Sequence, residues 1–355
     1  MKLVLADGAE FSGRPFGAVK QVRGEVVFNT GMVGYVETLT DPSYCGQILV
    51  TTYPLQGNYG VPAGPFESER VQVAGLVVHR HASAPSHRTA VRTLGSWLAA
   101  HGVPAIEGID TRALTQRLRE HGTMRGALQL EPGEGDGPSD AYEEVDLRHA
   151  VDLVTPRRVT RHAADGPRIL VIDTGAKENI VRSLQARGAA VVRVPFDHPW
   201  EGLLAEVDGV MLTNGPGDPK DMEPLVKRIR GLLDQEKPVF GICLGHQLLA
   251  LAAGADTYKL KYGHRSHNQP VMNLATRRAY VTSQNHGYAV NGESLPADWE
   301  PSFVNLNDGT NEGIRHRFLP FYSVQFHPEA AAGPRDAAFL FDDFLRVTKA
   351  LGARA

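Results

Sequence analysis

Residues 238–254 read PVFGICLGHQLLALAAG, and this stretch decides the fold. An apolar strand runs into Cys243, and an apolar helix begins within two residues of it. Gly241 and Gly245 flank the cysteine at the spacing of a nucleophile elbow, a sharp strand-to-helix turn that needs neighbours without side chains. The turn exposes the thiol near the positive end of the helix dipole, which favours a thiolate. An isolated cysteine is more commonly a buried core residue, but the paired glycines favour a nucleophile.

Two other loops supply partners for such a nucleophile. A strand over 321–326 leads to His327 and Glu329, which lie two residues apart and therefore on one side of an extended segment. His327 is the expected base, and Glu329 would hold its imidazole in one tautomer; the alternative is an exposed histidine and a surface acid. The turn NGPG at 214–217 follows another strand, and its backbone N–H groups, with that of Leu244, are candidates for stabilising an oxyanion.

The second half of the chain alternates between strands and helices. RILVID at 168–173 is a continuous apolar run typical of a strand buried on both faces. Further buried strands are predicted at 190–195, 209–214 and 238–243, with helices at 178–187 and 222–235. This period predicts an α/β class, with a C-terminal doubly wound domain whose sheet is mostly parallel. In such sheets the sites form at the carboxyl ends of the strands, where the Cys243 and NGPG loops both fall.

The first half is predicted to be a smaller α+β domain. Strand and turn patterns fill residues 1–80, and helices are expected at 88–101 and at 111–121, the latter with Asp110 as its N-cap. The polar segment EPGEGDGPSD at 131–140 has no large apolar side chain and predicts a solvated loop. We therefore divide the chain into a domain over 1–155, a linker over 156–167 and a domain over 168–355.

Composition limits the function classes. The 355 residues carry 37 Lys plus Arg against 40 Asp plus Glu, a net charge of −3, which argues against a large basic surface for nucleic acid or anionic membranes. The two cysteines cannot form a disulfide framework and indicate a reducing compartment. No apolar run is long enough for a membrane span or a signal peptide. We expect a cytoplasmic protein that binds neither nucleic acid nor membrane.

The histidines do not indicate a metal site by their spacing. His264 and His267 form an i, i+3 pair, and His79 and His81 form an i, i+2 pair. Neither pair has a cysteine or carboxylate at zinc spacing, so surface or loop histidines are expected and no metal ligand is assigned.

Four separated motifs together resemble the class I, triad-type glutamine amidotransferases. They are GICLGHQ, TNGPGDP, SQNHGYAV and VQFHPEA, and they occur in the order found in that family. The resemblance implies that Cys243, His327 and Glu329 form a catalytic triad that hydrolyses glutamine through a γ-glutamyl thioester. It also implies oxyanion donors and a glutamine pocket at Gly215, Gly217, Leu244, Gln247, Asn285, Gly287 and Tyr288. His286 lies in the same turn and is expected to contact either the substrate or an ammonia passage.

The first half narrows the resemblance. GEVVFNTGMVGYVETLTDPSY (24–44), ILVTTYPLQGNYG (48–60) and AIEGIDTRALTQRLREHGTMRG (105–126) look closely like the small subunits of carbamoyl-phosphate synthase. That family implies a glutamine contact from Ser43. It further implies a large-subunit partner that takes the ammonia, bicarbonate and ATP with Mg²⁺ to make carbamoyl phosphate for arginine and pyrimidine synthesis. No cofactor is expected on this chain. Ser266 and His267 depart from the family pattern, which commonly has glycines there.

Other functions remain open on the residues alone. A glutaminase subunit of another synthase, such as anthranilate synthase, is one alternative, although such subunits usually lack the N-terminal domain. A stand-alone cysteine hydrolase is another, and it would be active without a partner. A non-catalytic scaffold is a third, but it would have no need for Cys243, His327 and Glu329 together.

Overall fold

The computed structural model describes residues 1–131 and 144–352, which form two compact units, Met1–Ala150 and Val151–Ala355. Apart from Glu131, the loop predicted at 131–140 lies outside the described residues. In the described ranges, no helix combines the length and apolarity that a membrane crossing requires.

The N-terminal unit is built on short strands joined by turns. Its strands are β1 (Lys2–Leu5), β2 (Glu10–Ser12), β3 (Arg14–Gly17), β4 (Val22–Asn29), β5 (Ile48–Thr51), β6 (Leu55–Gln56), β7 (Gly75–Val77), β8 (Arg80–His81), β9 (Pro104–Glu107) and β10 (Met124–Gln129). Its helices are α1 (Tyr35–Thr40), α2 (Leu94–Ala100) and α3 (Thr111–His121), with 3₁₀ turns η1 (Pro42–Tyr44) and η2 (Leu147–His149). The main sheet has the order β2-β1-β10-β4-β5-β7-β9-β3, and β6 pairs with β8.

This sheet mixes parallel and antiparallel strands, as an α+β unit does. The pairs β4–β5, β5–β7 and β7–β9 are parallel, and the outer pairs are antiparallel. Buried side chains of α1 and α2 pack on the sheet, among them Leu39 and Trp97. The helix predicted at 111–121 is confirmed as α3, and its Asp110 side chain accepts a hydrogen bond from a first-turn N–H at 2.9 Å. The helix predicted at 88–101 is shorter, because α2 begins only at Leu94 behind its N-cap Thr93.

The C-terminal unit alternates strands with helices over its first half. Its strands are β11 (Thr160–His162), β12 (Arg168–Asp173), β13 (Ala190–Pro195), β14 (Gly209–Leu212), β15 (Val239–Ile242), β16 (Asp256–Asn273), β17 (Ala279–Asn291), β18 (Trp299–Asn305), β19 (Asn311–His316) and β20 (Phe321–Val324). Its helices are α4 (Ala150–Val154), α5 (Glu178–Gln185), α6 (Glu223–Leu233), α7 (Leu244–Ala253) and α8 (Phe339–Gly352), with 3₁₀ turns η3 (Trp200–Glu206), η4 (Pro219–Met222) and η5 (Gly292–Ser294).

The predicted doubly wound α/β architecture is confirmed in this unit. The sheet order is β11-β13-β12-β14-β15-β20-β19-β18-β16-β17, and the strands from β13 to β20 run parallel. Beyond β20 the sheet continues with antiparallel strands, which end in the long hairpin of β16 and β17. Residues 156–167, predicted as a linker, contain β11, which pairs with β13 inside this unit.

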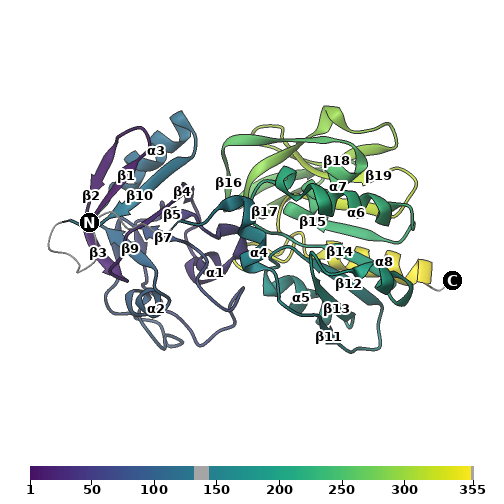
Figure 1. The fold of residues 1–355 in the computed structure, drawn as a ribbon, viewed down its shortest axis with the longest axis horizontal. Helices are drawn as coiled ribbons and strands as arrows, with labels where there is room; N and C mark the ends of the chain where they lie inside the picture. The colour runs from purple at the N-terminus through teal and green to yellow at the C-terminus, as the bar shows by residue number, and fades with distance from the viewer. Residues whose placement is uncertain (132–143, 353–355) are drawn as a thin grey trace. The chain divides into compact units, whose positions relative to one another are not determined.

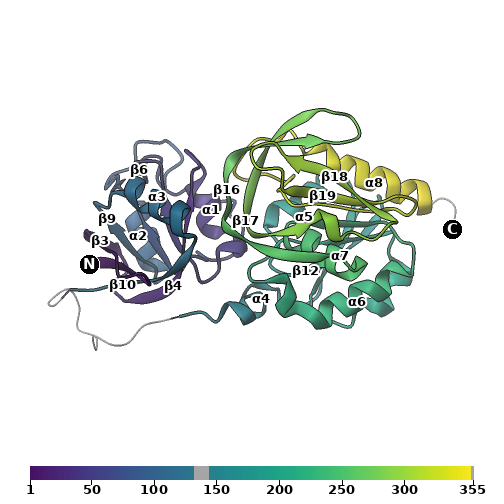
Figure 2. The same cartoon turned by 90° about the horizontal axis from the view of Figure 1, so that it is seen from above.

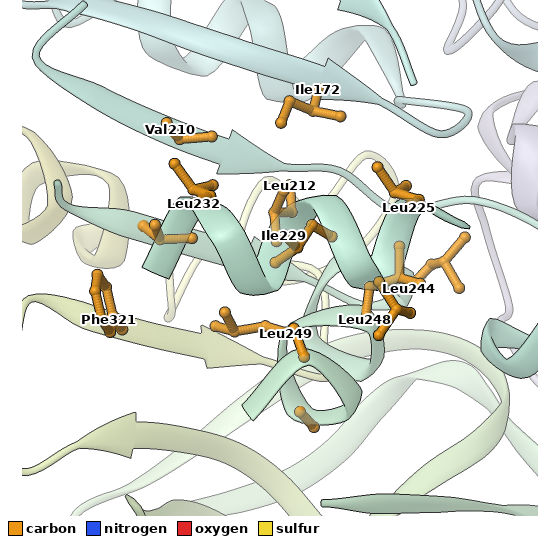
Figure 3. Packing of buried hydrophobic residues seen from close by; sticks show 14 of the residues in the cluster. Ile172, Val210, Leu212, Leu225, Ile229, Leu232, Leu244, Leu248, Leu249 and Phe321 are labelled. Carbon is orange, nitrogen blue, oxygen red and sulfur yellow. The ribbon is translucent and has the colours of Figure 1, made fainter. Parts of the chain in front are cut away.

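Helices cover both faces of the parallel strands (Figures 1 and 2). Buried side chains of α6 and α7 pack on one face, and those of α5 and α8 pack on the other. Figure 3 shows α6 and α7 side by side on the first of these faces, with Ile229 of α6 and Leu249 of α7 in one cluster with Leu212 of β14. Each fully buried leucine or isoleucine contributes roughly 1.5–3 kcal/mol, so this packing fixes α7, and with it the cysteine at its start.

Candidate active site

The predicted elbow at Cys243 is present between β15 and α7, but the cysteine is buried and not exposed as predicted. Cys243 adopts φ +53°, a conformation that a non-glycine residue rarely takes and that surrounding structure must hold. A Cβ on Gly245 would lie 2.3 Å from the carbonyl oxygen of Leu212, and one on Gly241 would lie 2.6 Å from that of Gly245. The backbone therefore approaches so closely that only glycine fits at both positions. The N–H of Cys243 donates to the carbonyl of Val324 at 2.9 Å, which ties the elbow to β20.

His327 and Glu329 follow β20 and lie together, as predicted. His327 Nδ1 is 2.6 Å from Glu329 Oε1, and both side chains are buried. The His327 backbone N–H donates to the carbonyl of Ser283 at 2.9 Å, so β17 fixes the loop. Burial would lower the pKa of His327, but the carboxylate of Glu329 and the nearby sulfur of Cys243 raise it. The site therefore joins a thiol, an imidazole and a carboxylate in series.

Lys177 is a site residue that the sequence patterns did not single out. It lies just before α5, and its Nζ is 3.2 Å from Glu329 Oε1 and donates to the carbonyl of Ala330. Burial would raise the pKa of Glu329, but His327 and Lys177 lower it. The available signal was position: Lys177 follows the carboxyl end of β12, the edge of the sheet at which sites form.

The NGPG turn follows β14 at the same edge of the sheet. The Asn214 side chain accepts from the N–H of Lys177 at 2.9 Å, and Thr174 Oγ1 donates to the carbonyl of Asn214 at 3.0 Å. A Cβ on Gly215 would lie 2.1 Å from the carbonyl oxygen of Thr174, so only glycine fits at this position. Gly217 has φ +91° and also needs glycine's freedom. The turn is thus held against the end of β12. Gly215 also lies close to Leu244, because a Cβ on Gly215 would be only 2.9 Å from Leu244 Cδ2.

The predicted glutamine-pocket residues of α7 and β17 surround the cysteine. The Cys243 thiol donates to the carbonyl of Asn285 at 3.6 Å. Gln247 is buried in α7, and its Nε2 donates to the carbonyl of Tyr288 at 2.9 Å and to Gln325 Oε1 at 3.0 Å. Gly287 lies between Asn285 and Tyr288 in β17. The structure therefore brings these residues into one neighbourhood, while their roles toward glutamine stay predictions.

Ser43 belongs to the N-terminal unit. It lies in η1, is buried, and its N–H donates to Asp41 Oδ1 at 2.9 Å. The glutamine contact predicted for it stays a prediction.

The interpretation of His264 as a surface or loop residue is wrong. His264 is 7% exposed and lies in β16, directly opposite His286 of β17. Burial would lower the pKa of His264, but Glu312 and Asp308 raise it, whereas burial lowers the pKa of His286 well below its ordinary value. Sequence spacing could not show this, because the partners come from different strands. Ser266 lies in the same strand, and its hydroxyl accepts from Gln269 Nε2 at 2.9 Å.

The family comparisons agree with this geometry. Residues 170–347 match the family Glutamine amidotransferase class-I, so the C-terminal unit, with its elbow cysteine and adjoining His–Glu pair, is an amidotransferase domain of that class. Residues 3–128 match the family Carbamoyl-phosphate synthase small chain, CPSase domain. The chain therefore belongs to the carbamoyl phosphate synthase small chains, the glutamine-hydrolysing subunits of that synthase.

Relatives from distant organisms share nearly the whole chain. The carbamoyl phosphate synthase small chain of Symbiobacterium thermophilum is 53% identical, with 96% of each chain covered. The arginine-specific small chain of Neosartorya fischeri is 48% identical over 97% of this chain and 79% of its own length. The multifunctional protein CAD of Squalus acanthias is 48% identical over 98% of this chain, which corresponds to 16% of that protein.

Proposed function

We propose that Cys243 is the nucleophile in glutamine hydrolysis and that the ammonia formed passes to a separate large subunit of the synthase. The contact series Cys243–His327–Glu329 carries this proposal, because it joins a nucleophile at a helix N-terminus, a base and a group that orients the base.

The chemistry follows from the positions of these groups. The thiolate of Cys243 attacks the side-chain amide carbon of glutamine, and the N–H groups of Gly215 and Leu244 stabilise the oxyanion. His327, held at Nδ1 by Glu329, donates a proton from Nε2 to the departing nitrogen, which leaves as ammonia and a γ-glutamyl thioester. His327 then takes a proton from water, which attacks the thioester, releases glutamate and restores the thiol.

Cysteine substitutions test the nucleophile with an internal control. Cys243→Ala should abolish glutaminase activity and stop labelling by an electrophilic glutamine analogue that alkylates thiols. Cys45→Ala is the matched control, because Cys45 is also buried and burial raises the pKa of its thiol. Glutaminase activity near the wild-type level in Cys243→Ala would refute the assignment.

The partner is proposed from the family and from the chemistry of ammonia. Ammonia is useful only if another site consumes it, and the sequence contains no recognisable ATP-binding motif. We place bicarbonate, ATP and Mg²⁺ on the large subunit, with no cofactor on this chain, in a cytoplasmic complex. Glutamine-dependent carbamoyl phosphate formation should require both chains, and they should co-elute on size-exclusion chromatography. Full glutaminase activity of this chain alone, without complex formation, would instead favour a stand-alone hydrolase.

A further inference from the structure

A second buried cluster of ligating side chains lies in the antiparallel part of the C-terminal sheet. His264 of β16, His286 of β17 and Glu312 of β19 each offer an atom within 4.8 Å of those of the other two. All three side chains are buried, and none of them has a step in the glutamine reaction proposed above. The two imidazole rings meet edge to face, with their centroids 4.9 Å apart.

His264 directs a lone pair into this cluster. Its Nε2 is 2.8 Å from Asp308 Oδ2, so the N–H is on Nε2 and is donated to a carboxylate. In the neutral imidazole, the form that can bind a metal ion, Nδ1 then has the lone pair; it is buried and, within the described residues, makes no hydrogen bond. Glu312 Oε1 is 3.4 Å from this nitrogen. His264 Nδ1 therefore faces a carboxylate oxygen of Glu312 with a lone pair that a metal ion could bind. The hydrogen bond from Nε2 to Asp308 fixes the orientation of the ring.

His286 is oriented in the same way. Its Nδ1 is 2.8 Å from the carbonyl of Tyr288, which can only accept, so Nδ1 bears the proton. In the neutral imidazole Nε2 has a lone pair, yet its neighbour at 3.1 Å is Gln284 Oε1, another acceptor. The Gln284 amide takes this orientation with its Nε2 donating to the Glu312 carboxylate at Oε2, 2.9 Å away. A cation at this point would remove the mismatch.

We propose that His264 Nδ1, His286 Nε2 and the Glu312 carboxylate bind one divalent transition-metal ion of the Zn²⁺ type. Two imidazoles and one carboxylate are a common zinc ligand set, and Zn–N bonds of about 2.0–2.1 Å require the ligand atoms to contract to roughly 3.3 Å apart. Metal-bound histidines usually donate their other N–H to a carboxylate or a backbone carbonyl. Asp308 and the Tyr288 carbonyl already fill those positions.

The proposed metal site adjoins the candidate active site through β17. Bound metal should therefore affect catalysis, an expectation that rests on the proposed function. Neighbouring residues of β17 serve the two places through different groups. Gln284 and His286 contact the cluster, whereas the carbonyls of Ser283 and Asn285 accept from His327 N–H and the Cys243 thiol. Drawing His286 toward a metal ion would displace the segment 285–288, so Zn²⁺ should inhibit the glutaminase.

Metal binding is measured in the full-length Cys243→Ala chain, because the thiol would otherwise compete for zinc. Zn²⁺ is titrated against a chromophoric chelator, and Co²⁺ is used to read tetrahedral coordination from its visible absorption. We expect one ion per chain. His264→Asn and Glu312→Gln should weaken binding by far more than tenfold, and Asp308→Asn should weaken it by about 10–100-fold by removing only the negative charge behind His264. His162→Asn, at an exposed histidine of β11, should change nothing.

Either of two outcomes would overturn the site: no binding in the Cys243→Ala chain, or equal affinity in the folded His264→Asn, Glu312→Gln and Asp308→Asn variants. Circular dichroism of each variant verifies folding, and Asp308→Asn keeps the test valid if the buried substitutions unfold. The titration needs no catalytic activity, so it decides the metal site even if the chain proves not to hydrolyse glutamine. In an active wild-type enzyme, the Zn²⁺ concentration for half inhibition should rise in Asp308→Asn by the same factor as the dissociation constant.

Discussion

Replacing Lys177 by methionine should destabilise the C-terminal unit and impair the triad together. The Lys177 and Glu329 side chains are 4% and 0% exposed, and Nζ lies 3.2 Å from Oε1. Methionine keeps the length and apolar stem of lysine but removes the charge. Breaking a buried ion pair from one side costs about 3–5 kcal/mol when the remaining charge has no other partner. Because Glu329 keeps its contact with His327, the cost here should lie near the lower limit, about 3 kcal/mol. We expect a loss of that size near pH 7 and a large fall in glutaminase activity.

The stability lost in Lys177→Met should depend on pH in a predictable direction. In the wild type the pKa of Glu329 is lowered from 4.5 to about 2, so its contribution to stability is present above pH 4.5 and is lost as the pH falls through about 2. Lys177→Met raises that pKa, and the carboxyl group then takes up a proton at a higher pH. The difference in unfolding free energy between wild type and variant should therefore shrink as the pH falls below about 5.

Urea unfolding followed by tryptophan fluorescence measures the effect in the relevant unit. A Trp97→Phe background leaves Trp200 and Trp299, which both belong to the C-terminal unit. Lys220→Met is the matched control: Lys220 pairs with Asp256 at 2.7 Å, but both side chains are more than half exposed, so the cost should stay below about 1 kcal/mol.

A double-mutant cycle with Glu329→Gln isolates the pair. Glu329→Gln leaves the buried Lys177 charge without its carboxylate, and Lys177→Met leaves Glu329 with only His327 as a partner. The double variant removes both members of the pair, so it should be more stable than the sum of the single losses predicts, by about 1–3 kcal/mol. Additive losses, or a Lys177→Met cost no larger than that of Lys220→Met, would show that this contact does not support the triad.

Three further changes test other parts of the structure. Gly245→Ala should lower both stability and glutaminase activity, because the new methyl group meets the backbone at 2.3 Å; Gly231→Ala, which meets nothing within 4 Å, should stabilise α6 by up to about 1 kcal/mol in urea unfolding. His327→Asn should cost most stability below pH 6.5, and the cost should decline as the pH rises toward about 10, since the raised pKa of His327 stabilises only the protonated form; a cost independent of pH between 6 and 10 would contradict this. Asp110→Ala should destabilise the N-terminal unit by about 0.5–2 kcal/mol through loss of the α3 N-cap, and an unchanged urea midpoint of Trp97 fluorescence would count against the cap.

Features that depend on neighbouring residues were predictable from the sequence. The alternation of apolar strands and helices predicted β12, β13, β14 and β15 and the helices between them, because each strand is buried on both faces and reads as a continuous apolar run. The elbow at Cys243 was predictable for a similar reason: its two glycines lie within two residues of the cysteine, and the structure shows that backbone contacts exclude any side chain there.

Features that depend on distant residues were not predictable. The segment at 256–273 mixes polar and charged residues, so it gave no strand signal, yet it forms β16 by pairing along most of its length with β17. Helix α1 was also missed: its six residues are too short for a helical period to be read. Lys177 carried no motif, and its importance arises because β12 and the loop after β20 bring it to Glu329 from a separate part of the chain.

Strand β17 contributes to two sites with different chemistry, the candidate active site and the proposed metal site. The SQNHGYAV motif was interpreted as a pocket motif, which accounts for Asn285, suggests only a contact with substrate or an ammonia passage for His286, and assigns nothing to Gln284. Neighbouring residues of β17 serve the two sites through different groups, a backbone carbonyl at Asn285 and a side chain at Gln284. The carbonyl of Asn285 accepts from the catalytic thiol, while Gln284 meets Glu312. A buried polar residue on a catalytic strand must either satisfy its hydrogen bonds or bind something that does. The acceptor-to-acceptor contact between His286 and Gln284 indicates the second, and a metal titration decides it.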